Sequence, residues 1–205
     1  MAFLFSLILK GSFTSNFLEV NNIRKDIRYS CYPFMREKSS LVDYEIRTDS
    51  LTTRIGAVLP ILRDDEACLV VYEDLHMIQP LAYHINGSVR GKLAITEEEL
   101  QWLSNRYDYY VGQVGDVIKQ FLLPQGSEAG ALLHVCRSEA KKSYRALHKV
   151  SEEREVPEIL FDFLGLLANV FFVMAVYINH KQGVDEIPFV SKSYPIKKKR
   201  KEEVK

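Results

Sequence analysis

The sequence has few cysteines and no excess of charge of either sign. Only three of its 205 residues are cysteines, Cys31, Cys68 and Cys136, and no two of them form a CxxC motif. This pattern excludes a disulfide scaffold and a zinc knuckle, and we expect a reducing, cytoplasmic environment. Lys and Arg together number 27, as do Asp and Glu, so no overall field attracts nucleic acid or an anionic membrane. Any anion-binding site must therefore be local.

Two apolar segments raise the question of membrane attachment. Met1–Leu9 has the length of a signal-peptide core, but no Lys or Arg precedes it and no small-residue cleavage site follows it. Phe163–His180 contains 18 residues without Asp, Glu, Lys or Arg, which reaches the lower length limit of a membrane-spanning helix. Asn169 in its middle and Asp162 at its edge instead favour the central helix of a bundle. We favour this buried helix over a membrane span.

Strand-like alternation of apolar and polar residues is nearly absent, and helical spacing dominates instead. Apolar side chains recur mostly at three- to five-residue steps, as on one face of an α-helix. Thr96 before three glutamates has the form of a helix N-cap, and so does Ser127 after a turn at Pro124. Asn86 and Gly87 are expected to stop the second helix. The expected helices cover residues 42–62, 68–85, 96–110, 127–150 and 157–180.

These helices predict an all-α fold in which five helices, joined by short loops, form one bundle. We expect the bundle domain over residues 41–190. Residues 1–40 have no clear period and are interpreted as a poorly patterned N-terminal segment. The tail over residues 191–205 contains the charge run KKKRKEEVK and is expected to be disordered.

The helix expected over residues 127–150 carries a row of basic residues. Arg137, Lys141 and Arg145 stand four residues apart, and like charges at this spacing destabilise an isolated helix. One interpretation is a solvated basic face relieved by Glu139 or by other acids. The other is an anion site in which Arg137 and Lys141 hold a polyphosphate or an acidic partner group. The spacing alone is compatible with both.

A resemblance to a known family bears on this choice. The run FLLPQGSEAGALLHVCRSEAKKSYRAL, Phe121–Leu147, resembles the signature of the PduO-type ATP:cob(I)alamin adenosyltransferases. In that signature, Phe, two apolar residues, Pro and a Gly pair lead into a helix with LHxxR and a basic doublet. Three more stretches resemble the first-helix motif, the start of the third helix and the usual ending of the family. They are VDYEIRTDSL (42–51), ITEEELQWL (95–103) and YINHKQGVDEIPF (177–189).

The resemblance implies a five-helix bundle that assembles as a homotrimer, with active sites between neighbouring subunits. Enzymes of this family bind ATP, Mg²⁺ and a reduced corrinoid such as cobalamin. The cobalt attacks the 5′ carbon of ATP, triphosphate leaves, and adenosylcobalamin forms. A positioned cation is needed where negative charge builds on the leaving triphosphate.

The resemblance also implies roles for individual residues. Phe121 matches the aromatic position below the corrin, where it excludes water and competing ligands. Arg137 matches the site arginine, and Asp49 matches the aspartate that pairs with it across the subunit boundary. Lys141 and Lys142 occupy the basic doublet. We therefore take Arg137, Lys141 and Asp49 as candidate catalytic residues, and Phe121 and Lys142 as candidate binding residues.

The chain also departs from the family pattern. Family members open with a Thr-Lys-Thr-Gly-Asp-type loop around ATP, whereas here only Lys10–Ser15, KGSFTS, is similar, and Lys10 becomes a candidate binding residue. The doublet is Lys141 and Lys142 where Arg is expected, so the bidentate fork is lost. On the last helix, Gly165–Asn169 replaces an Asn-Arg-Leu-Ser-Asp run.

Two hypotheses on function therefore stay open. The leading one is a divergent corrinoid adenosyltransferase that transfers the 5′-deoxyadenosyl group from ATP to cob(I)alamin. The alternative is a non-catalytic member of the family, a trimer that binds a corrinoid or a protein partner without productive ATP binding. An unrelated helical or membrane-attached protein is a third, weaker interpretation.

Overall fold

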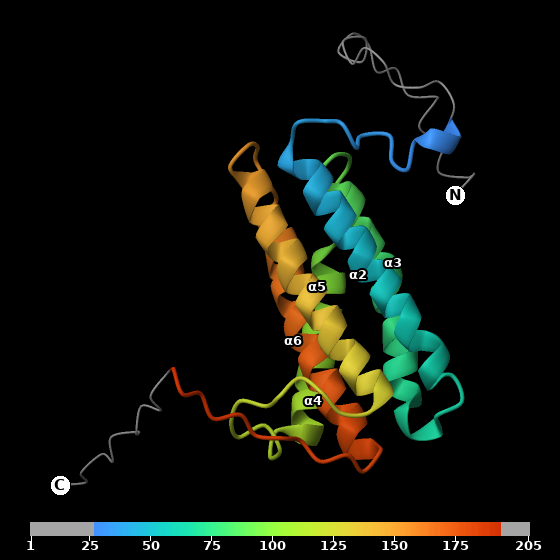
Figure 1. Ribbon diagram of the computed structural model, residues 1–205, viewed down its shortest axis with the longest axis vertical. Coiled ribbons are helices and arrows are strands. Elements are labelled where there is room, and N and C mark those ends of the chain that lie inside the picture. Colours follow the sequence, from blue (N-terminus) through green and yellow to red (C-terminus); the bar gives the residue numbers. More distant parts are fainter. Residues whose placement is uncertain (1–26, 194–205) are drawn as a thin grey trace, which may run out of the picture. The chain divides into compact units, whose positions relative to one another are not determined.

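The computed structural model describes residues 27–193, and the chain divides between Glu37 and Lys38 into two units. The described part of the first unit contains a short 3-10 helix, η1 (Ile27–Tyr29). The second unit contains five long α-helices and a second 3-10 helix, so the predicted all-α, five-helix fold is confirmed for the described residues (Figure 1). These elements are α2 (Ser40–Leu62), η2 (Glu66–Cys68), α3 (Leu69–Ser88), α4 (Glu97–Val114), α5 (Glu128–Ser151) and α6 (Glu158–Lys181). The interpretations of Met1–Leu9, Lys10 and the KKKRKEEVK run lie outside the described residues.

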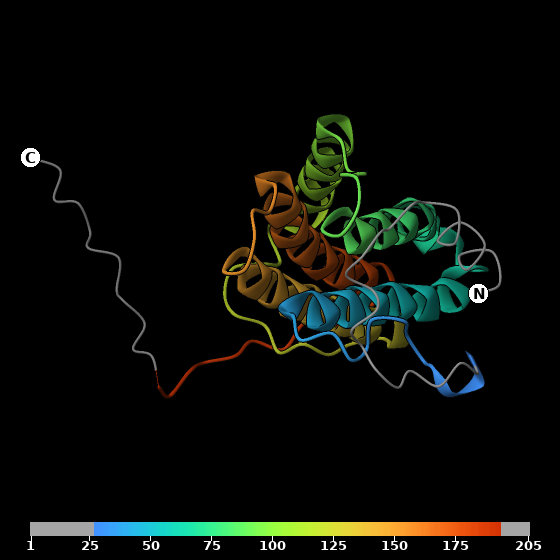
Figure 2. The same ribbon diagram turned by 90° about the horizontal axis from the view of Figure 1, so that it is seen from above.

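The five helices pack lengthwise as a bundle. α2 packs between α3 and α5, and α6 packs between α5 and α4 (Figures 1 and 2). Seen from above, α6 lies in the interior, with the other helices around it (Figure 2). The α5–α6 pair carries most of the candidate site.

The composition of α6 follows from this interior position. Within residues 27–193 it is the one helix whose length and composition would allow it to cross a membrane, and 67% of its most apolar window is buried. A helix that packs against neighbours on several sides needs apolar residues around most of its circumference. Burial inside the bundle thus accounts for the long apolar run that the sequence presents.

The helix starts predicted from capping residues are present. Thr96 Oγ1 accepts a hydrogen bond from the Glu99 N–H at 3.3 Å, and Glu99 Oε2 accepts one from the Thr96 N–H at 2.8 Å, which completes a capping box. Ser127 Oγ accepts a hydrogen bond from the Gly130 N–H at 3.2 Å and begins α5. Pro157 stands at the N-cap of α6, where its missing N–H costs nothing.

The predicted end of the second helix is wrong. α3 continues through Asn86 and Gly87 to Ser88. The Asn86 amide does not end the helix, because its Nδ2 donates to Glu45 O at 2.6 Å and to Thr48 Oγ1 at 2.7 Å on α2. A tertiary contact thus overrides the local stop signal.

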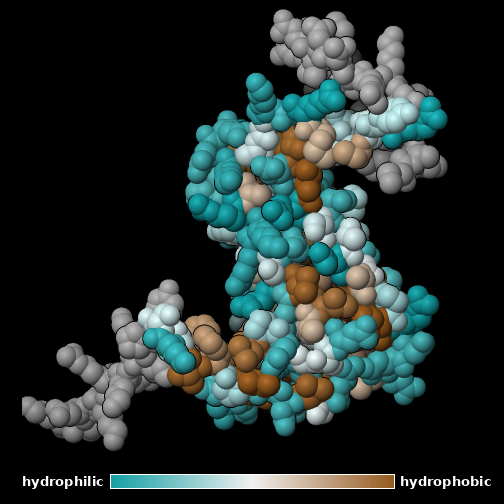
Figure 3. Space-filling model, in the orientation of Figure 1, coloured by the Kyte–Doolittle hydropathy of each residue, from teal (hydrophilic) through white to brown (hydrophobic). Residues whose placement is uncertain are grey.

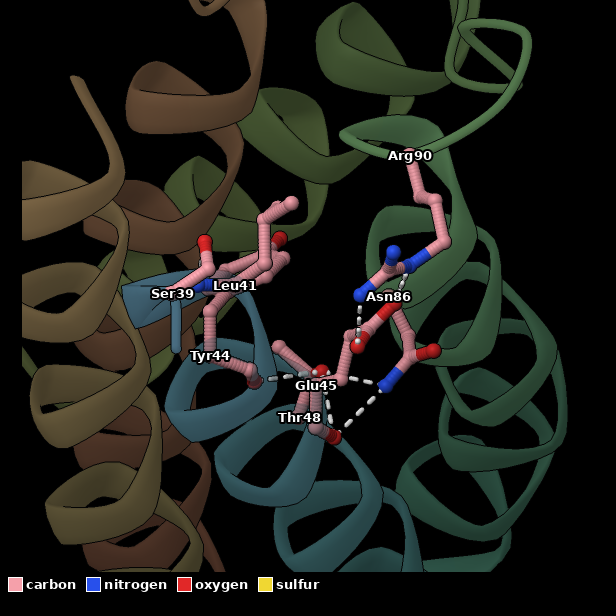
Figure 4. A network of polar contacts seen from close by, with 7 residues as sticks. All are labelled: Ser39, Leu41, Tyr44, Glu45, Thr48, Asn86 and Arg90. Carbon is pink, nitrogen blue, oxygen red and sulfur yellow. Dashed lines mark hydrogen bonds and ion pairs between the residues drawn. The ribbon is translucent and has the colours of Figure 1, made fainter. Parts of the chain in front are cut away.

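A buried polar network fastens the start of α2 to the end of α3 (Figure 4). The Glu45 carboxylate, 4% exposed, accepts hydrogen bonds from Arg90 Nε at 2.7 Å and Arg90 Nη2 at 3.0 Å. Tyr44 Oη donates to Ile85 O at 2.8 Å. Because a buried carboxylate is costly unless it is paired, the network fixes the register of α2 against α3. Asp49 lies one helical turn beyond Glu45 on α2.

Candidate functional site

Two cations without a counter-ion lie on one face of α5. The Arg137 side chain is half-buried, and its Cζ lies 5.0 Å from the ring centroid of Phe172 on α6. Lys141 is exposed one turn further along. Burial lowers the pKa of Arg137, and burial together with the Arg137 charge lowers the pKa of Lys141. Over residues 27–193 neither cation forms an ion pair, so their repulsion is left uncompensated.

Glu139 does not relieve these two charges. Its Oε1 accepts a hydrogen bond from Lys142 Nζ at 2.8 Å, in an ion pair across one turn of α5. Successive helical residues point about 100° apart, so Lys142 lies on a different face from Lys141. The pair therefore removes Lys142 from the basic face and leaves Arg137 and Lys141 open to an external anion.

His134 precedes Arg137 by one turn and was not among the predicted site residues. Its side chain is 5% exposed, its ring centroid lies 6.1 Å from that of Phe172, and neither ring nitrogen has a hydrogen-bond partner among the described residues. Burial and the nearby Arg137 charge lower the pKa of His134 to about 4. A neutral imidazole therefore borders the anion face. The LHxxR pattern was the only signal for it.

On α6, the residues near Tyr144 and Arg137 of α5 are small, apolar and polar. Gly165 faces the Tyr144 ring, and a Cβ added at Gly165 would lie 3.7 Å from that ring, which is an ordinary van der Waals contact. Asn169 is exposed one turn before Phe172, so its amide lies on the same side of α6 as the ring that covers Arg137. Among the five residues that replace the family's polar run, Asn169 thus keeps a hydrogen-bonding group on this face.

The loop before α5 presents an aromatic side chain to solvent. Phe121 is 80% exposed. Its carbonyl O accepts a hydrogen bond from the Phe189 N–H at 2.7 Å, and the Leu123 N–H donates to Ile187 O at 2.9 Å. An isolated antiparallel bridge centred on Leu122 and Pro188 results.

This pairing creates an exposed apolar patch. Directly opposed residues of an antiparallel pair point to the same side, so the pairing places Phe121 and Phe189 on the same side of the two segments. Figure 3 shows apolar surface, in brown, at the lower left, where the loop before α5 and the segment after α6 lie in Figure 1. We call this surface the loop patch. It is defined by the large apolar side chains that are exposed on these two segments, Phe121, Ile187, Phe189 and Val190.

Asp49 lies on another part of the bundle surface. It is exposed on α2 and accepts a hydrogen bond from the Tyr83 hydroxyl of α3 at 2.8 Å, which raises the pKa of Tyr83. In the described part of the chain Asp49 has no cationic partner, so it does not pair with Arg137 of its own chain. The structure thus brings Arg137 and Lys141 together and leaves Asp49 and Phe121 on separate surfaces.

The loop patch and the basic face lie at different positions along the axis of α5. Arg137 follows Glu128, the first residue of α5, by nine positions, which corresponds to roughly 14 Å of helix rise. A ligand that contacts both surfaces must therefore extend along α5. The apolar surface thus lies before the start of α5, and the positive charge lies near the middle of the helix.

Comparison with known proteins defines the class. A chain of five packed helices with a basic face on the fourth long helix is an all-α bundle of the adenosyltransferase type, and residues 35–178 match the family model described as cobalamin adenosyltransferase. The chain belongs to the cobalamin adenosyltransferase family.

Several curated relatives carry adenosyltransferase names. The chain is 26% identical over 146 residues to a corrinoid adenosyltransferase of Bacillus subtilis, an alignment that covers 69% of this chain and 75% of the relative. It is 24% identical over 143 residues to a cobalamin adenosyltransferase of Cupriavidus metallidurans, covering 68% and 74%.

Solved structures share the fold. A variant PduO-type adenosyltransferase from Lactobacillus reuteri, complexed with ATP, superposes with a TM-score of 0.67 at 22% identity, covering 75% of this chain and 88% of that one. A second variant of that enzyme, complexed with cobalamin and ATP, gives a TM-score of 0.66 at 21% identity, covering 74% and 84%. The PduO-type family resemblance of the sequence is confirmed.

Proposed function

We propose that this chain is a corrinoid adenosyltransferase, which transfers the 5′-deoxyadenosyl group from ATP to cob(I)alamin at a subunit interface. The observation that carries the proposal is the pair Arg137 and Lys141, two cations with no counter-ion in the described part of a chain from an adenosyltransferase family. Solved relatives complexed with ATP and cobalamin support the choice of substrates.

The proposed chemistry places the developing charge on the basic face. The cobalt electron pair forms a bond to the 5′ carbon of ATP, the carbon–oxygen bond breaks, and triphosphate leaves with that bond's electrons. Arg137 and Lys141 stabilise this anion, Arg137 by a planar fork and Lys141 as a point charge. Asn169 is positioned to hydrogen-bond the nucleotide from α6.

Mg²⁺ is proposed to enter with ATP. Residues 27–193 contain no cluster of three His, Cys, Asp or Glu side chains able to hold a metal ion, so we assign it no protein ligands. Phosphate oxygens and waters commonly supply most Mg²⁺ ligands in nucleotide sites.

The loop patch is proposed to receive the corrinoid. A corrin ring is broad and largely apolar, and it needs an apolar surface beneath cobalt that excludes water and a lower ligand. Phe121 and Phe189 offer such a surface because they project together from paired backbone segments. The exposed Phe121 is otherwise unexplained, since an isolated aromatic in water gains nothing from packing.

A homotrimer in the cytoplasm is proposed as the working form. Asp49 is exposed and lacks a cation, while Arg137 lacks an anion, so a neighbouring subunit is proposed to supply each with the other. Apolar side chains exposed on the α2–α3 face support an interface there, because such groups favour burial. They include Ile46, Met77 and Tyr83.

A non-catalytic corrinoid-binding protein is the second candidate. The observation that favours it is α6, where Gly165, Leu166 and Ala168 stand at positions that are polar in the family pattern. A site with fewer hydrogen-bonding groups could bind corrinoid without orienting ATP.

One assay separates the two candidates. The purified chain is incubated anaerobically with cob(I)alamin, ATP and Mg²⁺, and adenosylcobalamin and triphosphate are quantified by chromatography. The proposed function predicts equal amounts of both products. Corrinoid binding without either product would favour the non-catalytic candidate, and no binding of corrinoid or ATP would overturn both.

A further inference from the structure

Asn179, near the end of α6, is fully buried and uses the whole hydrogen-bonding capacity of its amide. Its Oδ1 accepts from the Ser127 N–H at 3.0 Å and from Ser127 Oγ at 3.1 Å. Its Nδ2 donates to Gln125 O at 3.1 Å and to Glu186 Oε1 at 2.8 Å. One side chain therefore joins α6, the loop before α5 and the segment after α6.

Two glycines leave the room that this amide occupies. A Cβ on Gly126 or on Gly130 would overlap the Asn179 side chain. Gly126 also has φ +141°, in a region that other residues rarely adopt. The loop before α5 is thus shaped around Asn179, because its backbone approaches the amide more closely than any residue with a side chain would permit.

The segment after α6 returns to the same amide. Gly183, with φ +67°, reverses the chain beyond the helix, and the Val184 N–H donates to the backbone O of Asn179 at 2.8 Å. Glu186 then reaches back to the Asn179 side chain, directly before residues 187–189 pair with 121–123. The backbone and the side chain of Asn179 therefore both bind the segment after α6, next to the place where it pairs with the loop before α5.

Glu186 is a costly group at this place. Burial raises the pKa of its carboxyl group, and its Oε2 is buried without a hydrogen-bond partner in the described part of the chain. A buried oxygen without a hydrogen-bond partner lowers stability. The stability of the fold therefore does not explain the Glu186 carboxylate. Its bond to Asn179 does explain it, because that bond holds residues 187–189 in place.

We propose that Asn179 and Glu186 are positioning residues for the corrinoid side of the site, which hold the loop patch so that Phe121 and Phe189 form one aromatic surface. This inference rests on the proposed function, since it concerns how the corrinoid is received. Neither residue touches the basic face around Arg137, which lies further along α5. Disturbing the two residues therefore affects corrinoid binding and leaves ATP binding intact.

The test measures KM for cob(I)alamin and for ATP separately in Asn179→Ala and Glu186→Gln. We expect the KM for cob(I)alamin to rise at least about tenfold and the KM for ATP to change less than about twofold, because misplacement is confined to one substrate surface. Gln182→Ala is the matched control. Gln182 lies near the same end of α6, but its Nε2 donates to Asp65 Oδ2 at 2.7 Å, away from the loop patch.

A second readout needs no substrate. Hydrogen exchange of the Leu123 and Phe189 amides, which donate across the paired segments, should accelerate in Asn179→Ala and stay at the wild-type rate in Gln182→Ala. Wild-type exchange and wild-type KM values in both Asn179→Ala and Glu186→Gln would overturn the inference while the proposed function stands. If the amides exchange faster in Asn179→Ala but the wild-type chain binds no corrinoid, the proposed function is overturned, and the positioning role with it.

Discussion

The Arg137 guanidinium of α5 covers the ring of Phe172 on α6, with Cζ 5.0 Å from the ring centroid, and no carboxylate within the described residues neutralises it. A cation held over an aromatic ring gains about 0.5–1 kcal/mol at an exposed site. That gain is offset by burial and by repulsion from Lys141, both of which disfavour the charge. The Arg137 charge therefore contributes little to the stability of the fold, and it is available to bind an anion.

Arg137→Met should therefore leave stability nearly unchanged. Removing the charge loses the contact with the Phe172 ring but relieves the repulsion from Lys141, and we expect a change in the free energy of unfolding below about 1 kcal/mol. Urea denaturation measures it. Inorganic triphosphate should raise the melting temperature of the wild type and not that of the variant. A large loss of stability, with triphosphate still stabilising, would make Arg137 a structural residue.

The two neighbouring lysines should behave differently. Lys142→Ala leaves the buried Glu139 carboxylate without its partner, so we expect a loss of about 1 kcal/mol in the free energy of unfolding, discounted because Lys142 is half exposed. Lys141→Ala should cost nothing measurable in stability. Lys141→Arg should raise the transfer rate, since a planar fork holds two phosphate oxygens. Equal destabilisation by the two alanine variants would contradict the assignment.

His134 should make stability depend on pH. Its pKa is about 4 in the folded chain against about 6.5 in an unfolded chain. Between these values the unfolded chain binds more protons, so the free energy of unfolding decreases as the pH falls, by at most about 1.4 kcal/mol per pH unit from this group. His134→Phe should flatten the dependence measured by urea denaturation at pH 7 and pH 5.

Asp49→Asn tests the proposed contact between subunits. If Asp49 pairs with Arg137 of a neighbour, the substitution removes one charge and leaves the other partly buried, which typically costs a few kcal/mol. Analytical ultracentrifugation should then show weaker assembly, or titration should show weaker ATP binding. Tyr83→Phe removes only the hydroxyl that donates to Asp49 and should have a smaller effect. A monomeric wild-type chain at micromolar concentration would contradict the trimer.

Local signals in the sequence located most of the fold. Thr96 and Ser127 mark helix starts because a hydroxyl before a helix satisfies amides within the same few residues. The end of α3 was missed because the Asn86 amide bonds to α2, a contact that no local pattern contains. The sequence of an apolar helix is compatible both with a bundle interior and with a membrane, and the burial of α6 in the bundle accounts for its composition.

The candidate site could be predicted only in part. The basic row on α5 is visible in the spacing. The sequence does not show that Lys142 pairs with the buried Glu139 while Lys141 stays open to an anion. The partnership of Phe121 with Phe189 joins residues far apart in the sequence and depends on the chain reversal after α6. Asn179 lies in the stretch over residues 177–189 that resembles the family ending, but no local pattern shows that its amide bonds to the loop before α5.

The rate of adenosylcobalamin formation in Arg137→Ala, relative to the wild type and to Arg145→Ala, tests the central claim most directly. Arg145 continues the same basic row two turns beyond Arg137 and has no assigned role. The account predicts that Arg137→Ala slows transfer by at least about a hundredfold, the usual scale for one preorganised electrostatic contact, and that Arg145→Ala retains the wild-type rate. Equal rates in all three proteins, or no product from the wild type, would contradict it.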